Sequence, residues 1–206
     1  MLLLKLTLAP LLVAVATVAA QKWGPRVGGL LMGLPLTTGP IFLLLLFEQG
    51  PDFAAEATLG ILFGLIGLTA FAVVYATVAA WTGWIGSIVS ATIAFFAVSI
   101  GARSLGTHIA VAGIAAWCVP ALALPLMRRP AFAMPHTNPP WWNLLVRMFA
   151  VAVLTLLATT MAMRLGAVFS GIVGTYPVAI TVVIIFTHHQ FGREPVTAML
   201  RGCVLS

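Results

Sequence analysis

The chain has 206 residues, of which 62% are hydrophobic and only 7% are charged. Globular domains carry roughly a quarter charged residues, so this composition excludes a water-soluble fold and favours helices in a lipid bilayer. The net charge of +6 comes from ten lysines and arginines that stand singly or in pairs near the ends of apolar runs. That distribution is typical of membrane-topology signals, and no nucleic-acid partner is expected.

The apolar runs predict an all-α polytopic membrane protein, because a spanning helix needs about 20 apolar residues. Eight transmembrane helices are expected, at residues 2–20, 27–47, 54–80, 84–101, 104–126, 144–163 and 166–187, with the eighth beginning near 195. The first run resembles a signal peptide, but it matches the internal run 144–164 and is therefore expected to be a retained helix. We expect a multi-pass protein of the bacterial inner (cytoplasmic) membrane, with the lipid bilayer as its first partner.

A repeat organises these helices, since residues 24–60 recur without a gap 142 positions later. The matching pairs are Gly24/Gly166, Gly29/Gly171, Pro35/Pro177, Gly50/Gly192 and Gly60/Gly202. Five predicted crossings separate the two copies, and an odd number predicts that the second copy is inverted in the membrane. The expected organisation is a first repeat of four helices at 1–103, a linker helix and Pro/Trp-rich loop at 104–143, and an incomplete second repeat at 144–206.

The pattern Gly29, Pro35, Glu48 and Gly50 resembles the GlpM family of small bacterial inner-membrane proteins. The second copy keeps the two glycines and the proline, but Gln190 stands where the first copy has its acid. The resemblance implies two GlpM-like units fused by a linker. It also implies an association with envelope polysaccharide, and it names no reaction.

Three of the four acids, Glu48, Asp52 and Glu56, follow one another at intervals of four residues. On a helix this spacing makes one stripe at the start of the third predicted span. The stripe is either a solvated helix N-terminus, where the backbone dipole stabilises carboxylates, or a cation or proton site at the mouth of a pathway. Glu56 lies deepest, and we expect it to be shielded from lipid and bonded to a polar partner.

Two prolines, Pro35 and Pro177, stand in the middle of matching spans. Each removes a backbone donor and frees a carbonyl one turn earlier. The freed carbonyls are expected to meet the hydroxyls of Thr37, Thr38, Thr175 and Tyr176, trapped water or a substrate. Broken helices at corresponding positions of inverted halves are typical of a midplane transport site, while kinks that only shape the packing are the alternative.

His188 and His189 follow the seventh span and predict an interfacial pair, with proton sensing as the alternative role. Gly60, Gly64 and Gly67 fall on one helix face and predict close helix packing. No nucleophile elbow, zinc-protease motif or phosphate loop is present in the sequence. We therefore expect no catalytic residue, metal or cofactor.

These features favour a small permease or exporter with a midplane site between inverted halves. The alternative is an accessory or scaffold subunit of a membrane complex, for envelope polysaccharide or for energy transduction. In the scaffold interpretation, the expected partners are other membrane proteins or further copies of the chain, in addition to the lipid bilayer. An intramembrane enzyme is the third interpretation, and the scarcity of ionisable groups in the spans speaks against it.

Overall fold

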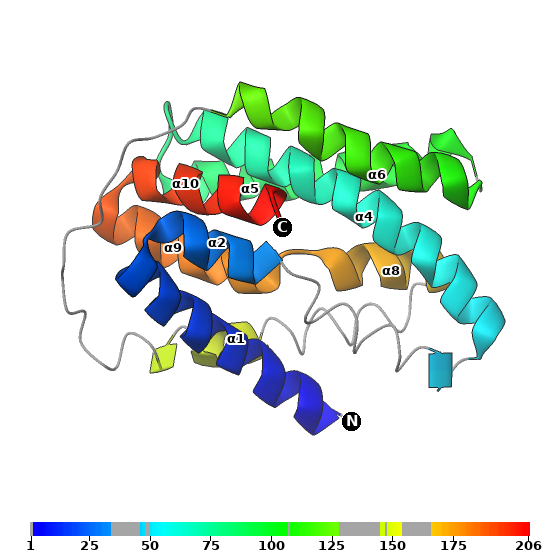
Figure 1. Cartoon of the computed structure of the whole chain (residues 1–206), viewed down its shortest axis with the longest axis horizontal. Helices are drawn as coiled ribbons and strands as arrows, with labels where there is room; N and C mark the ends of the chain where they lie inside the picture. The colour runs from blue at the N-terminus through cyan, green and yellow to red at the C-terminus, as the bar shows by residue number, and fades with distance from the viewer. Residues whose placement is uncertain are drawn as a thin grey trace.

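The computed structural model describes residues 2–33, 46–47, 50–106, 108–127, 145–146, 148–153 and 166–206. Over these residues the chain is helical and contains no strand, which confirms the all-α class (Figure 1). The helices are α1 (Leu2–Trp23), α2 (Pro25–Gly33), α4 (Pro51–Val78), α5 (Trp84–Gly101), α6 (Ile109–Ala123), α8 (Ala167–Thr175), α9 (Val178–Phe191) and α10 (Arg193–Val204). Two short 3-10 turns, η1 (Ala102–Leu105) and η2 (Leu124–Leu126), follow α5 and α6.

Four helical segments in the described part of the chain are long and apolar enough to cross a membrane. They are Pro51–Val78, Trp84–Ser104, Ile109–Leu126 and Ala167–Phe191. The last of these contains both α8 and α9, joined by a short break. A membrane protein is thus supported, while the total of eight spans stays a prediction. Most of 27–47 and 144–163 lies outside the described residues, and α1 and the 12-residue α10 are not among the four segments.

Glycines in the left-handed region of backbone conformation mark the helix boundaries at repeat-related positions. Gly24 (φ 94) and its partner Gly166 (φ 82) precede α2 and α8. Gly50 (φ 89) and its partner Gly192 (φ 78) precede α4 and α10. Residues with a Cβ rarely adopt such values, so the repeat seen in the sequence is also a repeat in backbone geometry.

The two repeat units pack on each other reciprocally. Helix α8 of the second unit, which corresponds to α2, packs on α4 of the first, while α10, which corresponds to α4, packs on α2. The closest contacts pair Gly171 with Ala57 and Gly29 with Met199, and they pair Gly60 with Val168 and Gly202 with Arg26. Each contact of one crossing thus recurs 142 residues away in the other, as in an interface with two-fold symmetry.

The same crossings confirm the predicted packing role of the glycine stripe on α4. A Cβ at Gly60 would collide with the backbone of Val168, and one at Gly64 would press on the side chain of Thr175. Gly67 similarly faces Ser99 and Phe95 of α5. Small residues at these positions allow helix backbones to approach closely where no water is available to drive association.

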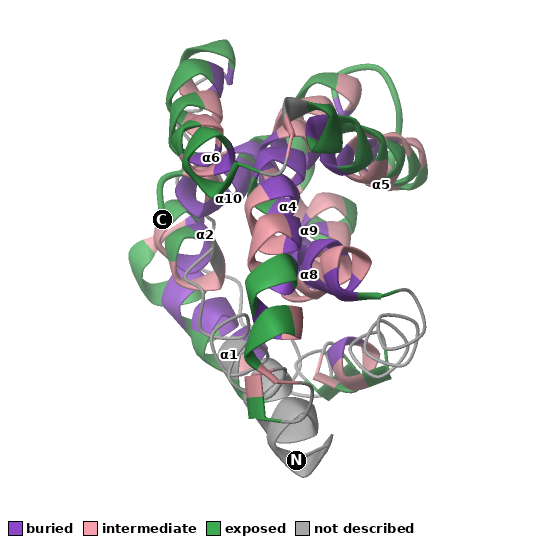
Figure 2. Cartoon of the chain, turned by 90° about the vertical axis from the view of Figure 1, so that its right-hand side faces the viewer, coloured by how far each residue is buried: buried purple, intermediate pink, exposed green. Residues whose placement is uncertain are grey.

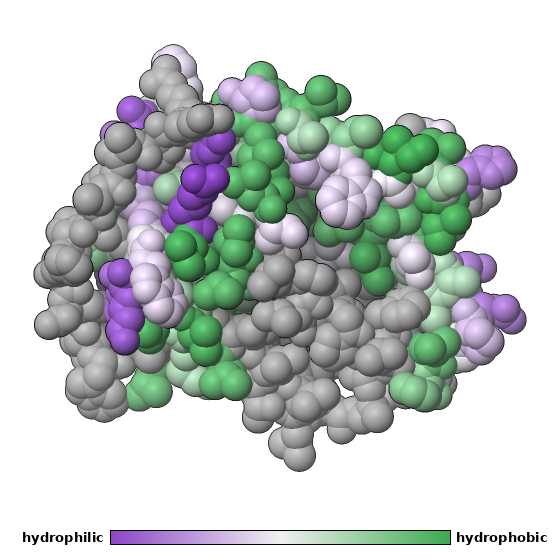
Figure 3. Space-filling model, in the orientation of Figure 1, coloured by the Kyte–Doolittle hydropathy of each residue, from purple (hydrophilic) through white to green (hydrophobic). Residues whose placement is uncertain are grey.

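The main core lies between α4, α5, α8, α9 and α10, and its largest fully buried side chains include Phe71, Tyr75 and Phe95. A smaller core joins α1 to α9 and α10. Figure 2 shows buried residues concentrated along α4, α8, α9 and α10, with exposed ones along the outer sides of α5 and α6. Many exposed side chains are large and apolar, such as Trp117 with 83% of its surface exposed, and apolar groups cover much of the described surface in Figure 3. Such a surface is suited to lipid.

Candidate functional site

The predicted break in the second repeat is confirmed at Pro177. Helix α8 ends at Thr175 and α9 begins at Val178. Pro177 has φ −79 and ψ 62, and the N–H of Val178 donates to the carbonyl of Tyr176 at 2.8 Å. These values define an inverse γ-turn, which turns the chain between two helices without a donor from proline.

The backbone itself satisfies the carbonyl that the proline frees, contrary to expectation. In an unbroken helix Val173 would receive the N–H of residue 177, and here it receives the N–H of Tyr176 at 3.1 Å. The hydroxyl of Thr175 donates to Gly171 in its own helix at 2.8 Å. The expectation that the Thr175 and Tyr176 hydroxyls would meet the freed carbonyl is therefore wrong, because the helix end tightens by one residue.

Tyr176 instead points its ring into the other repeat unit. The ring is stacked on Phe96, with centroids 5.7 Å apart and an angle of 8° between the planes. It also makes T-shaped contacts with the rings of Phe95 and Phe71, whose centroids lie 5.2 Å and 6.2 Å from its own. The Tyr176 hydroxyl lies 2.8 Å from Thr92 Oγ1, so its polar end is hydrogen-bonded inside an aromatic wall made by α4 and α5.

A second polar pair joins the repeat units nearby. The hydroxyl of Tyr75 on α4 lies 3.0 Å from Nδ1 of His188 on α9. Tyr75 is completely buried, and its ring is 6.3 Å from that of Phe71. A single aromatic cluster therefore connects the pair Tyr75–His188 to Tyr176, and a phenol bonded to an imidazole can hold or pass a proton.

Tyr75 and Thr92 were not predicted as residues of the site. Each stands in an apolar run with no local motif, and its partner is far away along the chain. One signal was present, because the chain has only two tyrosines. Both lie in this cluster, and a tyrosine in an apolar span needs a hydrogen-bond partner for its hydroxyl.

The predicted acidic stripe does not join this site. Asp52 and Glu56 are exposed, whereas Ala54 and Ala57 face the core from the same helix. The expectation that Glu56 is shielded is wrong, because the inward face of α4 is set by its small residues. Asp52 also lies 23 residues before Tyr75, about 35 Å along an α-helix.

The other predicted residues are placed as follows. His189 is exposed beside the half-buried His188, so only one histidine of the pair enters the protein interior. Four candidates, Pro35, Thr37, Thr38 and Glu48, lie outside the described residues. Whether the break at Pro177 has a counterpart at Pro35 therefore stays a prediction.

The cluster combines hydrogen-bonding groups with aromatic faces. Its polar atoms are two phenols, one imidazole and one threonine hydroxyl, with aromatic faces between them. Within the described ranges, no three histidine, cysteine or acidic side chains gather where they could hold a metal ion. Comparison of the chain with protein-family models, with curated proteins and with solved structures gives no match.

Proposed function

We propose that the chain is a small permease or exporter whose two repeat units are its moving parts. The observation that carries this proposal is the position of the broken helix. The break at Tyr176–Pro177 belongs to the second unit, and its aromatic and polar surroundings come from α4 and α5 of the first. A discontinuous helix at the interface of two repeats is the usual place of a transporter's substrate site.

The reciprocal crossings supply a second argument. At each crossing a glycine of one helix lies directly against the backbone of the other. Few bulky side chains therefore interlock at the contact. Alternating access requires two rigid units that change their relative tilt around a site between them. The bond between Tyr75 and His188 links the two units, so such a tilt changes the distance between these two side chains.

The finer parts of the proposal follow from the sequence alone. The inverted orientation of the halves depends on the five crossings between the copies. The GlpM-like family and the envelope-polysaccharide association depend on the spaced residues of the repeat. In this proposal the substrate meets the phenol of Tyr176 and the aromatic faces around it.

The test uses the full-length protein in liposomes and a panel of solutes followed by light-scattering or tracer uptake. The panel contains sugars, amino acids, monovalent ions and protons, the last detected with an internal pH dye. Wild-type protein should accelerate the flux of at least one solute. Pro177→Ala should slow that flux at least tenfold while the protein stays folded, because a continuous helix removes the break.

A matched control is Trp117→Phe, an aromatic substitution on the exposed face of α6 that should leave the flux unchanged. Two results together would favour the scaffold subunit over the permease. No solute would show flux, and membrane partners would co-purify in stoichiometric amounts and be released by Pro177→Ala.

A further inference from the structure

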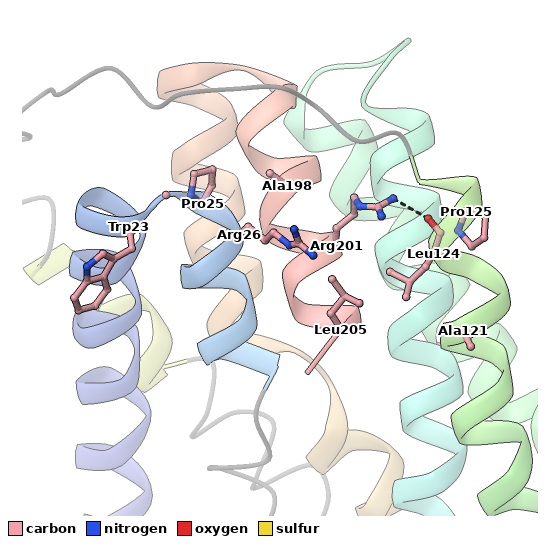
Figure 4. A pocket seen from close by; sticks show the side chains of 10 residues that line it. Trp23, Pro25, Arg26, Ala121, Leu124, Pro125, Ala198, Arg201 and Leu205 are labelled. Atoms are coloured by element: carbon pink, nitrogen blue, oxygen red, sulfur yellow. Dashed lines mark hydrogen bonds between the residues drawn. The ribbon is translucent and has the colours of Figure 1, made fainter.

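A cavity of about 560 Å³ opens between the start of α2, the last turns of α10 and the end of α6 with η2 (Figure 4). Among the described residues that line it, the ionisable ones are Arg26 and Arg201, and none is acidic. Figure 4 shows Arg26 reaching in from α2, and Arg201 reaching from α10 toward Leu124. The remaining lining is apolar or aromatic and includes Trp23, Pro125 and Leu205. The described lining of this cavity shares no residue with the Tyr176 cluster.

The repeat provides an internal comparison for these arginines. In the α4–α8 crossing, the positions of Arg26 and Arg201 are occupied by Val168 and Leu59. The backbone contact is the same in both crossings, since Gly60 abuts Val168 as Gly202 abuts Arg26. Apolar side chains therefore suffice for the helix packing, and the two arginines are an addition made at one crossing only.

The surroundings of Arg26 disfavour its positive charge, and those of Arg201 orient its guanidinium. Arg26 is exposed in the first turn of α2, where the helix dipole repels a cation and where no acid is present. Arg201 donates to the backbone carbonyls of Leu124 and Met127 at the end of α6 and η2. These bonds fix the direction of the guanidinium.

We propose that this cavity binds a phosphate-bearing anion, either the headgroup of an anionic phospholipid or a soluble phosphate ester. Guanidinium groups match the geometry of phosphate oxygens, and a charge-assisted bond of this kind is about twice as strong as a neutral one. Trp23 is 69% exposed at the rim, and tryptophan is suited to the headgroup level of a bilayer. An apolar rim with Leu205 and Pro125 accommodates the glycerol and the first acyl carbons of a lipid. This site is independent of the proposed transport activity.

The experiment is native mass spectrometry of the full-length protein in detergent, titrated with phosphatidylglycerol, with phosphatidylcholine, or with inorganic phosphate and glycerol phosphate. Phosphatidylglycerol should bind at least tenfold more tightly than phosphatidylcholine, because only the former has a net negative charge. Arg26→Val places at this exposed position the valine that the α4–α8 crossing has as Val168. This substitution should weaken the binding of phosphatidylglycerol about tenfold or more. Arg26→Lys should retain an intermediate affinity.

The control is Arg193→Leu, which removes one exposed positive charge at the opposite end of α10 and should leave the affinity unchanged. Two variants of Arg201 separate its charge from its hydrogen bonds. Arg201→Lys keeps the positive charge, whereas Arg201→Leu removes both the charge and the bonds to Leu124 and Met127. Binding of glycerol phosphate in place of the lipid, with the same loss in Arg26→Val, assigns the site to a soluble ester. Equal binding of the two lipids without binding of glycerol phosphate, or unchanged binding in Arg26→Val, would overturn the proposal.

Discussion

The Tyr75 hydroxyl shows how one buried polar atom connects two distant parts of the chain. Tyr75 is fully buried on α4, and an unpaired polar group there costs about 1–3 kcal/mol. His188 supplies the partner from α9, which belongs to the other repeat unit. The hydrogen bond therefore reports on the packing of the two units as well as on the tyrosine itself.

A double-mutant cycle of Tyr75→Phe and His188→Leu should give a coupling energy of about 1 kcal/mol, the usual net value of a hydrogen bond. The stability of each variant can be measured by reversible unfolding in mixed micelles. Tyr176→Phe combined with His188→Leu is the matched control, because these two side chains have different partners. Strict additivity of the first pair would show that the bond contributes nothing.

The two cysteines should differ sharply in reactivity. Cys203 is buried on α10, whereas Cys118 is exposed on α6. The thiolate is the reactive form, and a thiol buried in apolar surroundings ionises less readily than an exposed one and is out of reach of the reagent.

The measurement is labelling by N-ethylmaleimide in mild detergent from pH 7 to pH 9, in a Cys118→Ser variant that leaves Cys203 alone. Labelling should stay near background over this range and rise to completion only after unfolding in dodecyl sulfate. The Cys203→Ala variant, which leaves Cys118, is the positive control. Rapid native labelling of Cys203 would contradict its burial.

At the scale of helices, the reciprocal glycine contacts are the feature that holds the two units together. Gly29 and Gly171 are repeat partners, and each lies against the backbone of the opposing helix with no space for a Cβ. A methyl group at either position forces the helices apart, and overpacking of this kind costs about 1–3 kcal/mol.

Gly29→Ala and Gly171→Ala should therefore destabilise the protein by similar amounts, measured by thermal unfolding in detergent. Gly113→Ala is the control, because this glycine lies within α6 with nothing near the position of its Cβ. Alanine is the better helix former, so the control should be neutral or slightly stabilising. A loss of stability at only one of the two sites would contradict the symmetry of the crossings.

Features encoded by local chemistry were predictable from the sequence at this scale. The break at Pro177 follows from the missing donor, and the packing role of the Gly60 stripe follows from its helical spacing. The prediction that Glu56 is shielded was wrong because the spacing of the acids shows only that they share a helix face. It does not show which face of the helix points inward. The pair Tyr75–His188 was beyond reach, since it depends on how α4 packs against α9, and no local pattern carries that information.

At the scale of the whole molecule, the two crossings are both antiparallel and related by exchange of the units. Along α2 the contacts run from Arg26 to Gly29, and along α10 they run from Gly202 back to Met199. The α4–α8 crossing repeats this order with the roles of the units exchanged. A rotation of about half a turn produces such an arrangement, and the direction of its axis relative to the membrane decides whether the units are inverted.

The inverted arrangement predicts that repeat-related residues face opposite sides of the membrane. Lys22 is exposed at the end of α1, and its repeat partner is Arg164. Five predicted crossings separate these positions, and the distribution of basic residues favours the cytoplasmic side for Lys22. Lys22→Cys and Arg164→Cys, each in a background of Cys118→Ser and Cys203→Ala, place one thiol at each position.

A membrane-impermeant maleimide then reports the side of each thiol in right-side-out and inverted vesicles. We expect Lys22→Cys to be labelled only in inverted vesicles and Arg164→Cys only in right-side-out ones, with both labelled after permeabilisation. Labelling of both from the same side would mean that the two-fold axis lies along the membrane normal. The two units would then be parallel, and a permease that exposes its site alternately by exchanging inverted halves would no longer fit this chain.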